Sequence, residues 1–207
     1  MTDKTFRILF VRHAESLGNT GLTEYPPFHR DDPPLSENGL IQAKKLADSF
    51  DVGDITKLYS STLIRAIQTA YPVAEKLNLP LYLLHSVMEE NTFTAGTDIT
   101  YIKEKYPLAK YSDEAVCSGE ETAEQEAARA ERALDLIFSQ AEENEKIMVV
   151  SHGSFFGYLL RGCLGISLPE PFRWQVDNCS VTGILFEKGR IPKLCYANST
   201  AHLSERE

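Results

Sequence analysis

Short apolar runs alternate with amphipathic helix patterns along most of this 207-residue chain. The strand-like runs lie at about residues 6–11, 57–59, 79–84, 147–150, 180–187 and 191–196. Helix patterns lie at about residues 37–50, 62–77, 98–106 and 120–141, and one more begins near Ser154. Such alternation predicts a mainly parallel sheet covered by helices on both faces. The expected fold class is therefore α/β, a three-layer sandwich with a small irregular lid insertion at about residues 86–120.

Two of the helices carry boundary signals. Ser36 is expected to cap the helix that follows it, because its hydroxyl can accept a backbone N–H. Pro72 lies inside the second helix and is expected to kink it or end it early. The face of the first helix expected to point to the core consists of Leu40, Ala43, Ala47 and Phe50.

The composition and charge exclude several classes of protein. Hydrophobic residues make up 43% and charged residues 25%, as in ordinary globular domains, and no run approaches the ~18–20 apolar residues of a membrane span. The polar N-terminus does not resemble a signal peptide, so we expect a cytoplasmic protein. A net charge of −9 argues against general binding to nucleic acid or to membranes. We expect a single domain over residues 1–207 whose partner is a small molecule.

The sequence offers no metal or cofactor motif. The four cysteines have no C-x-x-C spacing, and reduced thiols are expected for a cytoplasmic protein. No G-x-G-x-x-G follows the first strand-like run, and no H-E-x-x-H occurs. We therefore expect a protein that uses neither a metal nor a cofactor.

Three predicted strand-to-helix junctions carry residues suited to an anion. Arg12 and His13 follow the first run, Arg65 lies about one turn into the second helix, and His152 follows the run at 147–150. The carboxyl ends of parallel strands share one edge, so these residues are expected to meet there. Arginine forks onto phosphate oxygens, and histidine can act as nucleophile or proton carrier. We also expect the helix that begins near Ser154 to offer the backbone N–H of that residue to the anion.

Together, four segments resemble the histidine phosphatase superfamily, in its phosphoglycerate-mutase-like branch. The resemblance covers nearly the whole chain and keeps the order of the family's motifs. The segments are Val11-Arg12-His13-Ala14-Glu15-Ser16 with Asn19, Leu35-Ser36-Glu37-Asn38-Gly39 with Gln42-Ala43, Ser60-Ser61-Thr62-Leu63-Ile64-Arg65-Ala66-Ile67-Gln68-Thr69-Ala70, and Val150-Ser151-His152-Gly153.

The resemblance implies a role for each of these site residues. His13 would attack phosphorus and become a phosphohistidine, which splits one difficult displacement into two easier ones. Arg12, Arg65 and His152 would surround the phosphoryl oxygens, with Asn19 as a further donor. We expect His13 to react as the neutral imidazole and His152 to act as the cation.

The resemblance also implies a proton donor in the segment after the third strand. That segment reads Val87-Met88-Glu89-Glu90-Asn91, and the family's apolar-x-Glu pattern favours Glu89 over Glu90. The alternative for either residue is a solvated loop carboxylate. Glu90 and His29, the latter in a proline-rich loop, are candidate substrate-binding residues. The common glycine of the family comes late here, at Gly96, so the lid departs from the family pattern.

The predicted function is a metal-independent phosphatase that hydrolyses a small phosphomonoester. One alternative is a cofactor-dependent phosphoglycerate mutase, which would use the same His13 chemistry. Mutases of this family carry a Phe-Thr-Gly-Trp loop before the Leu-Ser-x-x-Gly segment, and this chain has residues 24–34 there instead. Another alternative is a non-catalytic module that binds a phosphorylated ligand. The identity of the substrate and the oligomeric state cannot be predicted from the sequence.

Overall fold

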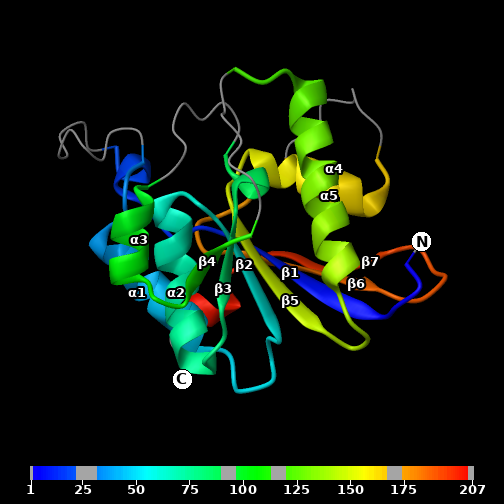
Figure 1. The fold of residues 1–207 in the computed structure, drawn as a ribbon, viewed down its shortest axis with the longest axis horizontal. Coiled ribbons are helices and arrows are strands. Elements are labelled where there is room, and N and C mark those ends of the chain that lie inside the picture. The colour runs from blue at the N-terminus through cyan, green and yellow to red at the C-terminus, as the bar shows by residue number, and fades with distance from the viewer. Residues whose placement is uncertain (1, 22–31, 90–96, 113–119, 167–173, 205–207) are drawn as a thin grey trace.

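Seven strands form one mixed sheet in which parallel pairs predominate, as predicted (Figure 1). The computed structural model describes residues 2–21, 32–89, 97–112, 120–166 and 174–204. The strands are β1 (Phe6–Arg12), β2 (Lys57–Ser61), β3 (Leu81–Leu84), β4 (Ala109–Tyr111), β5 (Lys146–Ser151), β6 (Val181–Phe186) and β7 (Lys193–Ser199). Their order is β4-β3-β2-β5-β1-β6-β7. Strand β6 runs opposite to the other described strands, so its pairings with β1 and β7 are antiparallel and the rest are parallel.

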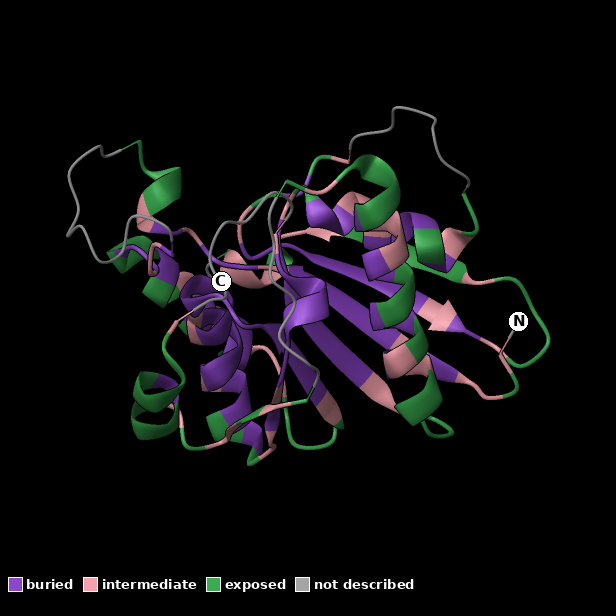
Figure 2. Ribbon diagram, turned by 45° about the horizontal axis from the view of Figure 1, so that its top comes forward, coloured by how far each residue is buried: buried purple, intermediate pink, exposed green. Residues whose placement is uncertain are grey.

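Helices cover both faces of the sheet and give the expected three layers. The described helices are α1 (Glu37–Asp48), α2 (Ile64–Leu77), α3 (Ile99–Lys105), α4 (Ala123–Gln140) and α5 (Phe155–Leu164). Successive residues of β5 divide between two cores: Met148 and Val150 pack with α1 and α2, whereas Ile147 and Val149 pack with α4 and α5. This alternation follows from the two-residue period of a strand. Figure 2 shows the resulting band of buried strands between the helices.

Helix α1 begins as predicted and buries the expected Ala43 and Ala47, but not Leu40. The Ser36 hydroxyl accepts the Gly39 N–H at 3.0 Å, which caps the helix. Leu40, expected in the core, is 52% exposed, and the buried residues are Gly39, Ala43, Leu46 and Ala47. A Cβ atom on Gly39 would lie 1.9 Å from the Glu15 carbonyl oxygen. The helix therefore approaches the chain after β1 through its glycine, and this contact turns Leu40 outward.

Helix α2 continues through Pro72 and ends at Leu77, so the expected early end is wrong. A proline inside a helix costs about 3 kcal/mol or more, because it removes a hydrogen bond and crowds the preceding turn. Tyr71, Val73, Ala74 and Leu77 are all buried around it. Packing of these side chains in the core offsets the cost of the proline.

Part of the segment expected to be an irregular insertion belongs to the layered fold. Within residues 97–112, α3 packs Ile102 into the same core as α2, and β4 pairs in parallel with β3. The predicted helix at 98–106 is present as Ile99–Lys105. Residues 90–96 and 113–119 of this segment lie outside the described residues.

The connections that follow the neighbouring strands β1 and β5 lead to opposite faces of the sheet. The chain leaves β1 toward α1 on one face, and it leaves β5 toward α5 on the other. Ligands of open α/β sheets bind at the carboxyl edge where such connections diverge. Among the described residues, no helix is long and apolar enough to span a membrane.

Candidate active site

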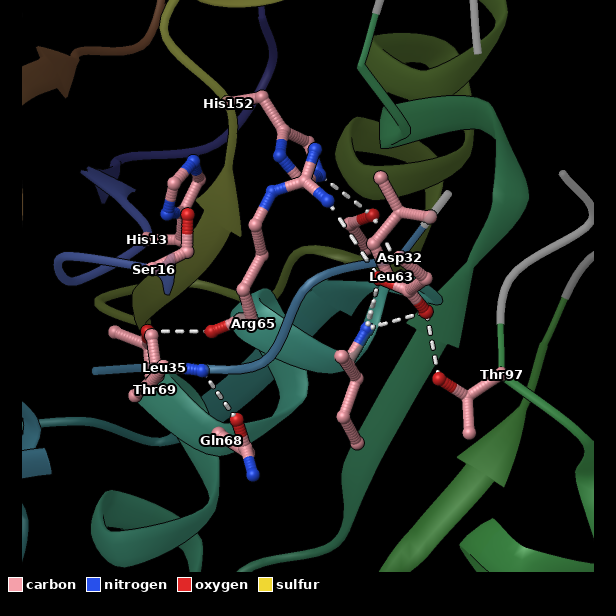
Figure 3. Close-up of polar contacts among 12 residues, drawn as sticks. His13, Ser16, Asp32, Leu35, Leu63, Arg65, Gln68, Thr69, Thr97 and His152 are labelled. Carbon is pink, nitrogen blue, oxygen red and sulfur yellow. Dashed lines mark hydrogen bonds and ion pairs between the residues drawn. The ribbon is translucent and has the colours of Figure 1, made fainter. Parts of the chain in front are cut away.

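Four neighbouring strands bring the predicted site residues to one edge. In the order β3-β2-β5-β1, their carboxyl ends are followed by Glu89, Arg65, His152 and His13, and Arg12 is the last residue of β1. The rings of His13 and His152 lie 5.2 Å apart between centroids. Figure 3 shows the side chain of Arg65 reaching from α2 toward both histidines. We call Arg12, His13, Arg65 and His152 the strand-end cluster.

His13 is held in the form that a nucleophile needs. Its side chain is buried, and its Nδ1 lies 2.7 Å from the Ala14 carbonyl oxygen. A carbonyl can only accept, so Nδ1 carries the proton and Nε2 keeps its lone pair. Burial lowers the pKa of His13 well below 6.5, and the Arg65 charge lowers the pKa further. The neutral imidazole expected from the sequence agrees with these surroundings.

His152 is also favoured as the neutral imidazole, which overturns the expectation of a cation. Burial lowers its pKa well below 6.5, with further lowering by Arg65 and His13. Its Nε2 lies 2.8 Å from the Ser61 Oγ, and that oxygen also accepts the Leu63 N–H at 3.2 Å. The Nδ1 of His152 is buried and has no partner among the described residues. This nitrogen remains available to a bound ligand.

Arg12 is fixed on one side and open on the other. Its Nη1 donates to the Val176 carbonyl at 2.6 Å, whereas its buried Nε has no partner among the described residues. A Cβ on Gly153 would lie 3.1 Å from this Nε, so the guanidinium packs directly against the glycine. Arg12 Nε and His152 Nδ1 are thus two buried polar atoms that a ligand oxygen would satisfy.

Arg65 is oriented by Asp32, a residue to which the sequence reasoning assigned no role. Both are buried, and Arg65 Nη1 lies 3.5 Å from Asp32 Oδ1. The same carboxylate accepts the Ile64 N–H at 3.0 Å and the Thr97 hydroxyl at 2.6 Å, as Figure 3 shows. Leu63 is the N-cap residue of α2, and its side chain has no oxygen that could accept a backbone N–H. Asp32 therefore caps the helix from a distance and anchors the guanidinium.

The chain after β1 is tied to α2 by Thr69. Its Oγ1 accepts the Ala14 N–H at 2.9 Å and donates to the Arg65 carbonyl at 2.7 Å. Gln68, one residue earlier, accepts the Leu35 N–H at 2.8 Å (Figure 3). The Thr69 bonds fix the backbone that follows His13 relative to the backbone of Arg65.

Glu89 occupies the helix terminus that we expected a bound anion to use. It is half-buried, and its Oε1 accepts the Phe155 N–H at 3.1 Å. Its charge raises the pKa of both Arg12 and Arg65, against the larger lowering by burial. The carboxylate of Glu89 thus meets the N–H that follows Ser154, while the Ser154 side chain is exposed and makes no cap bond. The contact of the Ser154 backbone N–H with a ligand stays a prediction.

The remaining candidates have different outcomes. Asn19 is exposed, and its Oδ1 accepts the Ser16 N–H and hydroxyl and the Asn178 amide, so only its Nδ2 could serve a ligand. His29 and Glu90 lie outside the described residues. Neither can be placed in the site.

Ser61 and Arg129 are further residues to which the sequence reasoning assigned no role. Ser61 lies within the quoted motif, and only its position beside His152 singles it out. Arg129 lies on the buried face of α4, and a charged side chain buried on a helix face indicates a specific partner. No cluster of three or more possible metal-ligating side chains occurs in the described parts of the chain.

Comparison with known proteins agrees with a site of this kind. Residues 8–199 match the family described as the histidine phosphatase superfamily (branch 1). This chain belongs to that superfamily. Phosphoserine phosphatase 1 of Hydrogenobacter thermophilus is 30% identical over 211 residues, which cover 96% of this chain and 95% of that protein. A Schizosaccharomyces pombe protein described as "Probable phosphatase" is 35% identical over 172 residues, and the match spans 78% of this chain but only 58% of that protein.

Histidine phosphatase superfamily relatives also include mutases. A Yersinia pestis protein described as "Probable phosphoglycerate mutase" is 28% identical over 95% of this chain and 94% of its own length. Among solved structures, a mutant phosphoserine phosphatase of Entamoeba histolytica in complex with phosphoserine superposes with a TM-score of 0.69. It is 25% identical and covers 96% of this chain and 100% of its own.

Proposed function

We propose that this protein is a metal-independent phosphatase that hydrolyses a small phosphomonoester through a phosphohistidine on His13. The observation that carries the proposal is the state of His13: a buried, neutral imidazole with Nδ1 bonded to the Ala14 carbonyl and Nε2 free, beside two arginines. Phosphoryl transfer depends on positioning and charge neutralisation, and this arrangement supplies both.

In the first step, His13 Nε2 attacks phosphorus while the bond from phosphorus to the ester oxygen breaks. Arg12, Arg65 and His152 Nδ1 bind the phosphoryl oxygens. The leaving alkoxide takes a proton from Glu89. The negative charge of the bound phosphate dianion favours the protonated form of this carboxyl group.

In the second step, water attacks the phosphohistidine. The Glu89 carboxylate accepts a proton from that water, the bond from nitrogen to phosphorus breaks, and inorganic phosphate leaves. His13 returns to its neutral form and Glu89 to its protonated form, so one cycle consumes one ester and one water. The residues of the site suffice for both steps without a metal.

A phosphoglycerate mutase remains the second candidate, because the Yersinia pestis relative is described as one. It would return the phosphoryl group from His13 to a second hydroxyl instead of to water. Incubation with 3-phosphoglycerate and a trace of 2,3-bisphosphoglycerate separates the two. Rapid isomerisation without release of phosphate would reverse our choice.

The nucleophile is tested by His13→Ala. We expect wild-type protein mixed with a ³²P-labelled phosphomonoester to carry an acid-labile, base-stable label, and the variant to carry none and to lose turnover by about 10⁴-fold or more. His202→Ala, at a half-buried histidine in the 3-10 turn Ala201–Leu203, is the control and should keep the label. Wild-type turnover in His13→Ala would falsify the assignment. Phosphoserine and 3-phosphoglycerate are the first substrates to rank by kcat/KM.

A further inference from the structure

A buried arginine on α4 contacts the segment that carries Glu89. Arg129 is 1% exposed, and its Nη1 donates to the carbonyls of Ser86 at 3.3 Å and Met88 at 2.8 Å. Its Nη2 lies 3.4 Å from the carbonyl oxygen of Glu89 itself. One guanidinium therefore binds three carbonyls of the four-residue stretch 86–89.

The remaining carbonyl of this stretch is bound by the strand next to the nucleophile. Ser151, the residue directly before His152, donates its hydroxyl to the Val87 carbonyl at 2.8 Å. The backbone of 86–89 is thus held between α4 and the end of β5. We call residues 85–89 the Glu89 arm.

Arg129 also reaches the residue that holds the Glu89 carboxylate. Its guanidinium carbon lies 3.9 Å from the centroid of the Phe155 ring, a cation–π contact. The backbone N–H of the same Phe155 donates to Glu89 Oε1 at 3.1 Å. Arg129 therefore contacts both supports of Glu89, the backbone of its segment and the residue at the start of α5.

Two glutamates fix the plane of the guanidinium. Glu121 accepts from Arg129 Nε at 3.0 Å and lies 2.8 Å from Nη2, and Glu126 pairs with Nη2 from the preceding turn of α4. Both carboxylates and the Phe155 ring match the planar fork of an arginine, which a lysine cannot reproduce.

From these contacts we propose that Arg129 is a positioning residue that holds Glu89 in place for proton transfer to the leaving group. The proposal rests on the proposed function, because it assumes that Glu89 is the acid. A proton donor must lie within hydrogen-bond reach of its target, and small misplacements are costly. Removal of the guanidinium should leave the strand-end cluster able to attack but should weaken protonation of the alcohol.

The test separates substrates by their leaving groups. The p-nitrophenolate of p-nitrophenyl phosphate leaves without protonation, whereas the alkoxide of phosphoserine needs a proton. We expect Arg129→Lys to lower kcat/KM for phosphoserine by about 10²-fold and to change that for p-nitrophenyl phosphate by less than about 5-fold. Because kcat/KM covers the steps up to release of the alcohol, it reports proton donation and not attack by water.

Control variants make the result specific. Glu89→Gln should show the same selective loss, and the double variant Arg129→Lys/Glu89→Gln should lose little more than Glu89→Gln alone. Arg132→Lys, at an exposed arginine on the same helix, should match the wild type for both substrates. If Arg129→Lys does not fold, Glu121→Gln tests the same contact and should show a smaller selective loss.

Each outcome has a distinct meaning. Equal losses for both substrates in Arg129→Lys, with a selective loss in Glu89→Gln, would overturn the positioning role and leave the proposed function standing. If Glu89→Gln responds equally to both leaving groups, Glu89 is not the acid and the positioning role fails with it. An additive double variant would likewise show that Arg129 acts independently of Glu89.

Discussion

The strand-end cluster and the Glu89 arm lie at the same edge of the sheet but are positioned in different ways. Arg12, His13 and His152 come directly from strand ends, and Arg65 lies in the first turn of the helix after β2. Glu89 follows a short 3-10 turn after β3 and takes its support from Arg129, 40 residues further along the chain. The residues proposed to bind phosphate are thus placed by regular strands, whereas the proposed proton donor is supported by a side chain from another element.

This difference has a functional consequence. In the proposed mechanism, the strand-end cluster binds the phosphoryl group, which every phosphomonoester shares. The Glu89 arm in that mechanism serves the leaving group, which differs between substrates. Damage to the cluster should therefore affect all substrates alike, and damage to the arm should affect them unequally.

Among variants that keep the His13 nucleophile, the largest effect on both substrates is expected from Arg65→Lys, which alters the strand-end cluster. Lysine cannot fork onto two phosphoryl oxygens while keeping the contact with Asp32, so kcat/KM should fall by about 10²-fold. The fall should be similar for p-nitrophenyl phosphate and phosphoserine, measured at pH 7. A fall restricted to phosphoserine would break the distinction between the two regions.

A smaller effect is expected from Gly153→Ala. Its new Cβ would lie 3.1 Å from Arg12 Nε, so the guanidinium must shift by a few tenths of an ångström. We expect kcat/KM to fall by about tenfold for both substrates, since misplaced charge weakens stabilisation of the transition state. Gly157→Ala is the matched control on α5, because nothing lies within 4 Å of its new Cβ. Equal activity of the two variants would show that Arg12 tolerates the displacement.

The cluster should also make stability depend on pH. The pKa values of His13 and His152 lie well below 6.5 in the folded protein, so the unfolded chain binds more protons as the pH falls below about 6.5. The free energy of unfolding should then fall with decreasing pH, by up to about 1.4 kcal/mol per pH unit for each histidine. Urea unfolding between pH 7 and pH 5 measures this slope.

A matched variant shows which region is responsible for the slope. His13→Asn should give a shallower slope than the wild type, because one depressed pKa is removed. Arg129→Lys should change the slope less than His13→Asn does, because lysine keeps the positive charge that helps to lower the pKa of His152. An unchanged slope in His13→Asn would exclude His13 as a source of the dependence.

The smallest effect is expected from removal of metal ions. Both regions act through arginine, histidine and carboxyl groups, so prolonged dialysis against EDTA should leave kcat/KM unchanged within error. Complete loss of activity, restored by a divalent cation, would contradict the histidine mechanism.

Much of the fold followed from local patterns in the chain. Ser36 capped α1 as expected, and the alternating apolar runs predicted a mainly parallel sheet. The errors arose where contacts distant in sequence outweighed local preference. Close approach of Gly39 to Glu15 turned Leu40 outward, and core packing carried α2 through Pro72.

The site divides in the same manner. Arg12, His13, Arg65 and His152 stand beside predicted strand ends, and a parallel sheet brings such positions to one edge whatever its strand order. The protonation expected for His152 was mistaken, because it depends on burial and on the charge of Arg65 from helix α2. At the start of α5, Glu89 accepts the Phe155 N–H, a contact that no local pattern indicated.

The sequence by itself determined the layered fold, the family and the residues able to bind phosphate, because these depend on periodicity and on side chains at strand ends. The tertiary structure alone decided how those residues are held. Asp32 reaches Arg65, Ser61 reaches His152 and Arg129 reaches the Glu89 arm across 33 to 91 positions of the chain. Such contacts depend on the order of strands and the packing of helices, which no local pattern of residues encodes.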